Sequence, residues 1–117
     1  MTTRDTIQSY FENLRGKSGW EVFLSDDLAF TSFTSPIKHV TGKGAYIEAT
    51  KRFFSMIKAL EVRGILVDGQ RACALTRYEL QVPGGPAFES QVAELFEVSD
   101  GKIKSLEIYF DSSSFPK

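Results

Sequence analysis

The sequence predicts an α+β fold, in which a curved mixed or antiparallel sheet wraps around three N-terminal helices and leaves a cone-shaped cavity. Two observations support this prediction. Apolar residues recur with the helical period in the first half of the chain, and from Ala59 onward they recur every second residue. Turn-forming residues then divide the second half at 68–69, 83–86 and 100–101. The length of 117 residues suits a single domain over 1–117.

Three helical segments are expected: one capped by Thr3 or Asp5 and ending near Arg15, a short one after Ser18, and the longest over 45–57. Each has apolar residues at helical spacing, which predicts one buried face. The third follows Gly-Lys-Gly, a sequence that permits a tight turn into the helix.

The expected strands alternate apolar and polar residues, and four long ones are linked by hairpins. Asp-Gly at 68–69 and 100–101 is typical of two-residue hairpin turns, and Gly64 indicates a bulge. Phe115 in the tail is expected to fold back as a plug. The predicted strands cover 28–34, a short segment 37–41, 60–67, 70–82, 88–98 and 103–111.

The strand at 70–82 carries the most informative charges. Arg77 and Glu79 are two residues apart and therefore point to one side, together with Leu75. The apolar character of Leu75 predicts that this side is the concave, buried one. An Arg and a Glu in this arrangement form either a structural ion pair or the polar end of a pocket.

The parity of each strand also predicts the pocket wall, since an apolar cavity with few polar groups is the usual site for a small molecule. Tyr10 lies on the apolar face of the first helix, where its hydroxyl either reaches solvent or donates a hydrogen bond into the pocket. The residues expected to contact a small apolar ligand are Trp20, Phe30, Ser32, Phe54, Leu75, Val92, Leu106, Ile108 and Phe110.

Glu94 is expected on the same concave face, beside Arg77 and Glu79. Two carboxylates with one guanidinium leave excess negative charge, so one Glu should have a raised pKa. That carboxyl is the candidate general acid or base, with Tyr10 or Arg77 as donor to a developing oxyanion. The alternative is that Glu94 reaches solvent at the rim of the cavity and has no role.

Composition excludes several other classes of function. Fifteen acidic against fourteen basic residues give no field that would recruit nucleic acid or an anionic membrane. No apolar run approaches the ~18 residues of a membrane span. The lone Cys73 and single His39 disfavour a disulfide or a zinc site, so no metal and no cofactor is expected. A reducing cytoplasm is the predicted location.

The opposite face of the sheet is expected to bind a second copy of the chain. If Leu75 faces the cavity, an apolar set faces outward, and so large a patch is uncommon on a monomer. A two-fold homodimer through this face is therefore predicted. The set comprises Thr76, Tyr78, Leu80, Ala93, Leu95 and Tyr109.

The order of these elements, with FEVSDGKI followed by YFD near the end, resembles the nuclear transport factor 2-like superfamily. The similar branches are the SnoaL-like polyketide cyclases, the limonene-epoxide hydrolase-like proteins and the steroid delta-isomerases. The resemblance implies a cystatin-like α+β barrel, a homodimer, and an isomerase, cyclase or hydrolase acting without a cofactor on a polyketide, terpenoid or steroid-like molecule. The alternative is a non-catalytic ligand-binding or structural domain, in which Arg77 and Glu79 are only a buried ion pair.

The catalytic residues of these families are only partly matched. Arg77-Tyr78-Glu79 resembles the Arg-x-Asp of the epoxide hydrolases, but Ile108 stands where they have a second catalytic Asp. Phe30 and Ser32 stand at the positions of their Tyr and Asn, and Ser32 also replaces the basic Asp of the delta-isomerases. Tyr10 and Glu94 match the oxyanion-binding Tyr and Asp of the delta-isomerases, with Glu in place of Asp.

Overall fold

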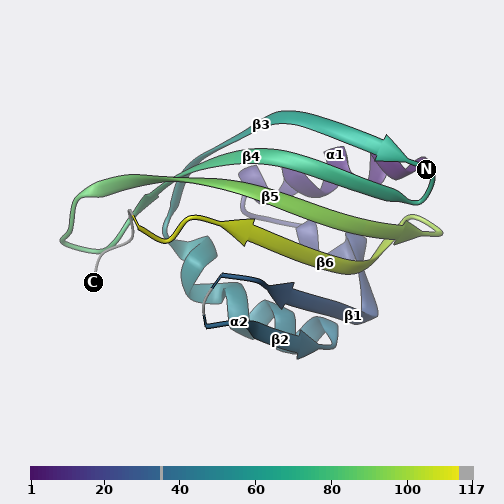
Figure 1. Cartoon of the computed structure of the whole chain (residues 1–117), viewed down its shortest axis with the longest axis horizontal. Coiled ribbons are helices and arrows are strands. Elements are labelled where there is room, and N and C mark those ends of the chain that lie inside the picture. The colour runs from purple at the N-terminus through teal and green to yellow at the C-terminus, as the bar shows by residue number, and fades with distance from the viewer. Residues whose placement is uncertain (35, 114–117) are drawn as a thin grey trace.

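The computed structural model describes residues 1–34 and 36–113, and in them two α-helices pack against a six-stranded mixed sheet (Figure 1). The predicted α+β fold is therefore confirmed. The sheet order is β2-β1-β6-β5-β4-β3. The elements are α1 (Thr3–Arg15), the 3₁₀ helix η1 (Trp20–Phe23), β1 (Leu24–Ser32), β2 (Lys38–Thr41), α2 (Lys43–Ser55), β3 (Ile57–Asp68), β4 (Arg71–Gln81), β5 (Ala87–Ser99) and β6 (Lys102–Phe110).

The helical part differs from the prediction in two respects. Only two of the three expected helices are α-helices, because η1 has room for a single turn between Gly19 and the start of β1. Gly19 adopts φ 84°, which favours glycine, and it supplies no side-chain cap. The second difference is the cap of the first helix, which is Thr2 and not Thr3 or Asp5 as predicted. The Thr2 hydroxyl accepts from the Asp5 N–H, and the Asp5 carboxylate accepts from the Thr2 N–H.

The sheet is open and does not close into a barrel, since β2 and β3 form its two ends. Neighbouring strands are antiparallel except for β1 and β6, which run parallel. β1 begins at Leu24, earlier than expected, and an irregularity in its register with β6 lies between Leu24 and Ala29. Ser25, Asp26 and Asp27, which precede the strand predicted over 28–34, are thus part of β1.

The hairpin predictions are confirmed. Gly69 and the Asp100-Gly101 pair have positive φ angles at the β3–β4 and β5–β6 turns, and a register shift lies between Val62 and Gly64. Phe115 lies outside the described residues.

The helices occupy the concave side of the sheet, as Figure 1 shows. α1 contacts β3, β4, β5 and β6, whereas α2 contacts β1 and β2. Tyr10 and Phe11 of α1 meet each other and Phe96 of β5 edge to face, with ring centroids 5.2 to 6.1 Å apart. This aromatic core fills one end of the concave side and leaves the end beneath α2 for a pocket.

Candidate functional site

The face of β4 that points into the protein is the opposite of the one we predicted. Thr76 and Tyr78 are buried, whereas 44% of Leu75 is exposed. The register explains this, because Thr76 pairs with Val92 and Tyr78 with Ser90 on the inner face of β5. The prediction that Leu75, Arg77 and Glu79 face the cavity is wrong, as is the prediction that Thr76, Tyr78 and Leu80 face outward. Both faces of β4 carry apolar residues. The face without ionised groups is the buried one, because burying Arg77 and Glu79 would cost more free energy.

The cluster expected from Arg77, Glu79 and Glu94 does not form, since Glu94 alone is on the inner face. Arg77 instead pairs across the outer face, with its Nη1 3.0 Å from Glu89 and its Nε 3.5 Å from Glu61. The ion pairs of Arg77 in the described residues therefore go to neighbouring strands, and the alternative of a buried Arg77–Glu79 pair is wrong too. A partly exposed network of this kind contributes little to stability.

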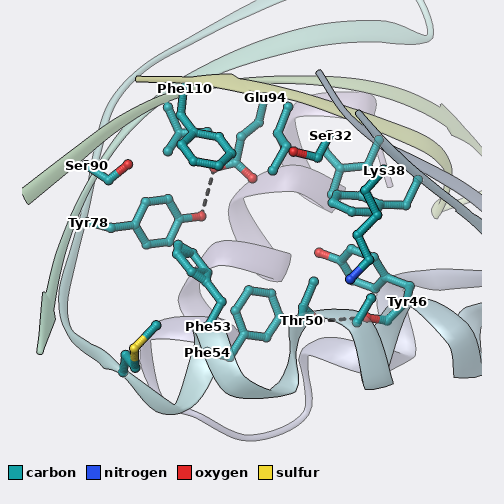
Figure 2. Close-up of a pocket in the computed structure, with 16 residues that line it drawn as sticks. Ser32, Lys38, Tyr46, Thr50, Phe53, Phe54, Tyr78, Ser90, Glu94 and Phe110 are labelled. Atoms are coloured by element: carbon teal, nitrogen blue, oxygen red, sulfur yellow. Dashed lines mark hydrogen bonds between the residues drawn. The ribbon is translucent and has the colours of Figure 1, made fainter. Parts of the chain in front are cut away.

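A pocket of about 230 Å³ lies between α2 and the inner face of β1, β6, β5 and β4 (Figure 2). Its walls are mainly apolar. The predicted contact residues that line it are Phe30, Ser32, Phe54, Val92, Leu106, Ile108 and Phe110. The lining residues that we did not predict are Lys38, Tyr46, Ala49, Thr50, Phe53, Met56, Tyr78, Ser90 and, as a wall residue, Glu94.

Tyr10, Trp20 and Leu75 do not line the pocket. Leu75 is on the outer face, whereas Tyr10 and Trp20 lie in the core behind the pocket wall. The Tyr10 hydroxyl is 2.9 Å from the Tyr46 hydroxyl, and the Trp20 ring packs edge to face on Phe54 at 5.0 Å. These two residues hold Tyr46 and Phe54 in place, because a buried phenol needs a hydrogen-bond partner and a packed ring fixes a rotamer.

Among the described residues, Glu94 is the only Asp, Glu, Lys, Arg or His that is buried, and 4% of its surface is exposed. Its Oε2 accepts hydrogen bonds from the Thr76 hydroxyl at 2.7 Å and the Tyr78 hydroxyl at 2.8 Å. Burial raises the pKa of Glu94 from 4.5 to about 7, although both hydrogen bonds lower it. The prediction of a Glu with a raised pKa is confirmed for Glu94, but the cause is burial and not a second carboxylate. The alternative of a rim position in solvent is wrong.

Because both hydrogen bonds reach Oε2, the other carboxyl oxygen is the one left for a ligand. No hydrogen bond from a residue within 1–34 or 36–113 reaches Oε1. The protonated carboxyl can donate from Oε1, and the ionised one can accept a proton there. A pKa of about 7 populates both forms near neutral pH, which suits a general acid or base.

The tyrosines around Glu94 remain neutral phenols. Burial raises the pKa of Tyr10, Tyr46 and Tyr78 above the ordinary value, most strongly for Tyr10 and Tyr78, and the nearby Glu94 carboxylate raises each further. Their hydroxyl groups therefore keep their protons near neutral pH and can donate hydrogen bonds. Figure 2 shows Tyr78 directed toward Glu94 from one wall of the pocket and Tyr46 on another.

The helical part of the pocket could have been recognised from the sequence. Tyr46, Thr50 and Phe53 are spaced four and three residues apart, so they share one face of α2. Thr50 uses its hydroxyl within the helix, where it donates to the Tyr46 carbonyl at 2.8 Å. Tyr78 and Ser90 carried no such signal, because their face of the sheet depends on register.

No group of three or more His, Cys, Asp or Glu side chains is close enough to share a metal ion in the described part of the chain. The described helices include none that is long and apolar enough to cross a membrane. The pocket has one carboxylate, Glu94, and one cationic side chain, Lys38, among its lining residues.

An α+β fold with a curved open sheet, two helices on its concave side and a pocket between them defines a protein of the nuclear transport factor 2-like class. The chain belongs to the SnoaL-like domain family, whose sequence profile matches residues 4–106. No curated protein matches the chain.

Solved structures of the same class superpose well. A protein of nuclear transport factor 2-like fold from Burkholderia pseudomallei K96243 gives a TM-score of 0.81 at 16% identity over 95% of this chain and 92% of that one. A candidate SnoaL-like polyketide cyclase from Jannaschia sp. CCS1 gives 0.80 at 16% identity, covering 93% and 85%. A protein of ketosteroid isomerase-like fold from Catenulispora acidiphila DSM 44928, in complex with trimethylamine, gives 0.79 at 17% identity, covering 93% and 87%. At these identities the likeness establishes the fold.

Proposed function

We propose that the protein binds a small, mainly apolar molecule in the pocket beneath α2 and that Glu94 is the acid–base group that acts on it. The observation that carries this proposal is a single buried carboxyl on an apolar wall, with one oxygen held by Thr76 and Tyr78 and the other left to the pocket. Enzymes that transfer protons at carbon use a carboxylate in such surroundings. Membership of the SnoaL-like family supports the same class of function.

The volume of the pocket limits the part of the ligand that it encloses. A cavity of about 150 Å³ holds a benzene molecule, and the pocket here has about 230 Å³. One substituted ring therefore fits inside. A single-ring terpenoid or a short polyketide fits this space better than a steroid, whose further rings would extend outside it.

The residues around the pocket suggest how a proton transfer would proceed. Ionised Glu94 would remove a proton from a carbon next to a carbonyl and return it to another atom of the same molecule. The Tyr10 and Tyr46 hydroxyls are 2.9 Å apart, and either can be the donor. With the fully buried Tyr10 as the donor, the Tyr46 proton would be left for the carbonyl oxygen as negative charge develops there. This is the chemistry of an isomerase or cyclase and needs no cofactor. Hydrolysis of the limonene-epoxide type has less support, because Arg77 and Glu79 are outside the pocket.

Exchange of the α-protons of cyclohexanone for deuterium, followed by NMR in D₂O, tests this proposal without knowledge of the natural substrate. The wild type should accelerate the exchange, and Glu94→Gln should lower that acceleration by about 100-fold, as expected for loss of a general base. Glu79→Gln, on the outer face of the neighbouring strand, is the matched control. Equal rates for wild type and Glu94→Gln would exclude the acid–base role. Binding without exchange would favour the alternative of a non-catalytic ligand-binding protein.

We also propose that the protein is a homodimer through the outer face of the sheet. Phe33, Leu75 and Tyr109 are each at least 40% exposed there, and Ala93 links the last two in the sheet register. The Phe33 and Tyr109 rings stack at 4.9 Å. Exposed apolar residues contiguous across several strands are typical of an interface. A cytoplasmic location, suggested by the unpaired Cys73, stays a prediction.

A further inference from the structure

The Ser90 hydroxyl has no role in the chemistry proposed for Glu94. Ser90 is 2% exposed and lines the pocket. Among the buried side-chain nitrogen and oxygen atoms of residues 1–34 and 36–113, only its Oγ has no hydrogen-bond partner. A buried hydroxyl without a partner destabilises a protein, so such atoms are rare in folded chains. A ligand that supplied the missing hydrogen bond would remove this cost.

The position of Ser90 relative to Glu94 is set by β5. The two residues are four apart on the inner face, with Val92 between them. At about 3.3 Å per residue their Cα atoms are about 13 Å apart. The Tyr78 ring faces Ser90 across the β4–β5 pair, but its hydroxyl is bonded to Glu94 and does not serve Ser90. Along β5, Ser90 and Glu94 therefore present polar atoms to the pocket at two separated points, with the apolar Val92 between them (Figure 2).

The side chains that the sheet register places beside Ser90 do not bond its hydroxyl. On the inner face, the register places Tyr78 opposite Ser90 and Val92 two residues along the strand, and the β5–β6 pairing ends at Val92 and Phe110. The Ser90 hydroxyl has no hydrogen-bond partner among the described residues, and a polar atom on an otherwise apolar ligand would supply one.

We propose that Ser90 is a specificity-determining residue that recognises a second oxygen of the ligand, at the end remote from the group that contacts Glu94. This deepens the function proposed above and rests on it. The ligand class is then a single-ring or short-chain compound with a carbonyl at one end and a hydroxyl or second carbonyl at the other. A ketone without a second oxygen binds without a hydrogen bond to Ser90.

Three ketones test the proposal by titration with NMR detection of the protein: cyclohexanone, 4-hydroxycyclohexanone and 2-hydroxycyclohexanone. The 4-hydroxy compound has oxygens at opposite ends of the ring, whereas the 2-hydroxy compound has them adjacent. Wild type should bind the 4-hydroxy compound roughly three- to tenfold more tightly than cyclohexanone, the contribution of one hydrogen bond. The 2-hydroxy compound should show no gain. Ser90→Ala should abolish the gain and keep the affinity for cyclohexanone, and Ser99→Ala on the same strand should keep both.

The outcomes separate this inference from the proposed function. If cyclohexanone binds and Ser90→Ala still prefers the 4-hydroxy compound, or if wild type never prefers it, the role of Ser90 is excluded and that of Glu94 stands. If none of the ketones binds wild type, the proposed ligand class fails and the inference fails with it. Thermal unfolding without ligand is a further check. Ser90→Ala should unfold at the wild-type temperature or above, and a lower temperature would show that the hydroxyl has a structural partner.

Discussion

The two faces of the β4–β5 pair place charged side chains in opposite environments. On the outer face Arg77 bridges Glu61 and Glu89, and about 60% of each Glu side chain remains exposed. On the inner face Glu94 is buried without a cation and is held by two hydroxyl groups. Water screens the outer charges, and removing one of them costs little. Burial of Glu94 opposes ionisation, so its pKa is raised to about 7 and its protonation state becomes adjustable near neutral pH.

This comparison shows that a charge gains chemical importance from its surroundings and not from the number of charges beside it. In the sequence, Arg77 and Glu79 were the stronger candidates for a functional site, because they are two opposite charges at a spacing of two residues. Glu94 stands alone between Ala93 and Leu95. The isolated carboxyl is nevertheless the one that the fold removes from water. Four substitutions test how far the two faces differ.

The largest effect is expected for Leu75→Glu on the outer face. If this face is the dimer interface, the change places a charge on it in both subunits and removes two buried Leu side chains. Each such burial contributes about 1.5–3 kcal/mol, so dimerisation should weaken by about 3–6 kcal/mol. Light scattering at micromolar concentration should give a dimer mass for wild type and a monomer mass for the variant. Lys51→Glu, on the exposed side of α2, should remain dimeric. A monomeric wild type would exclude the interface.

Glu94→Gln should change the pH dependence of stability. The folded pKa of about 7 is above the ordinary 4.5, so the folded state holds more protons than the unfolded state between these values. The free energy of unfolding of wild type therefore falls as pH rises from about 4.5 to 7, by up to about 3 kcal/mol. The variant lacks this loss. Urea unfolding should show equal stability at pH 4 and a variant more stable by about 3 kcal/mol at pH 8.

The outer-face control for that measurement is Glu79→Gln, whose stability should stay within about 0.5 kcal/mol of wild type at both pH values. If the stability of wild type and Glu94→Gln changed in parallel with pH, a raised pKa of Glu94 in the folded state would be excluded.

A smaller effect is expected for Tyr78→Phe, which keeps the ring against Phe53 and removes the hydroxyl that donates to Glu94. That hydrogen bond lowers the pKa of Glu94, so its loss should raise the pKa above about 7. Carbon-13 NMR of the Glu94 carboxyl should follow the shift. Above pH 8, where Glu94 is ionised, the variant should lose about 1–2 kcal/mol of stability. An unchanged titration midpoint would mean that Tyr78 does not stabilise the carboxylate.

The smallest effect is expected for Arg77→Gln. Its ion pairs to Glu61 and Glu89 are partly exposed, so the variant should lose less than about 1 kcal/mol of stability. Raising the salt concentration to 1 M should narrow the difference further. Cyclohexanone binding should be unaffected. A loss of binding would indicate that Arg77 acts on the pocket in spite of its position outside it.

Local signals in the sequence determined most of the fold. The change of period at Ala59, the Asp-Gly turns and the bulge at Gly64 depend on neighbouring residues, and each is present in the structure. The same holds for the inward faces of β5 and β6, where Val92, Leu106 and Phe110 line the pocket as predicted. In those strands one face is clearly more apolar than the other, and alternation then decides which side is buried.

Only the tertiary structure decided the face of β4 and therefore the composition of the site. Leu75 on one face and Tyr78 and Leu80 on the other make both sides of that strand apolar enough to be buried. The choice depends on the register with β5, which sets Tyr78 opposite Ser90, and on the cost of burying Arg77 beneath the helices. The raised pKa of Glu94 and the unpaired Ser90 hydroxyl have the same origin. Both arise from the removal of water by residues that are distant in the chain, a property that no local pattern contains.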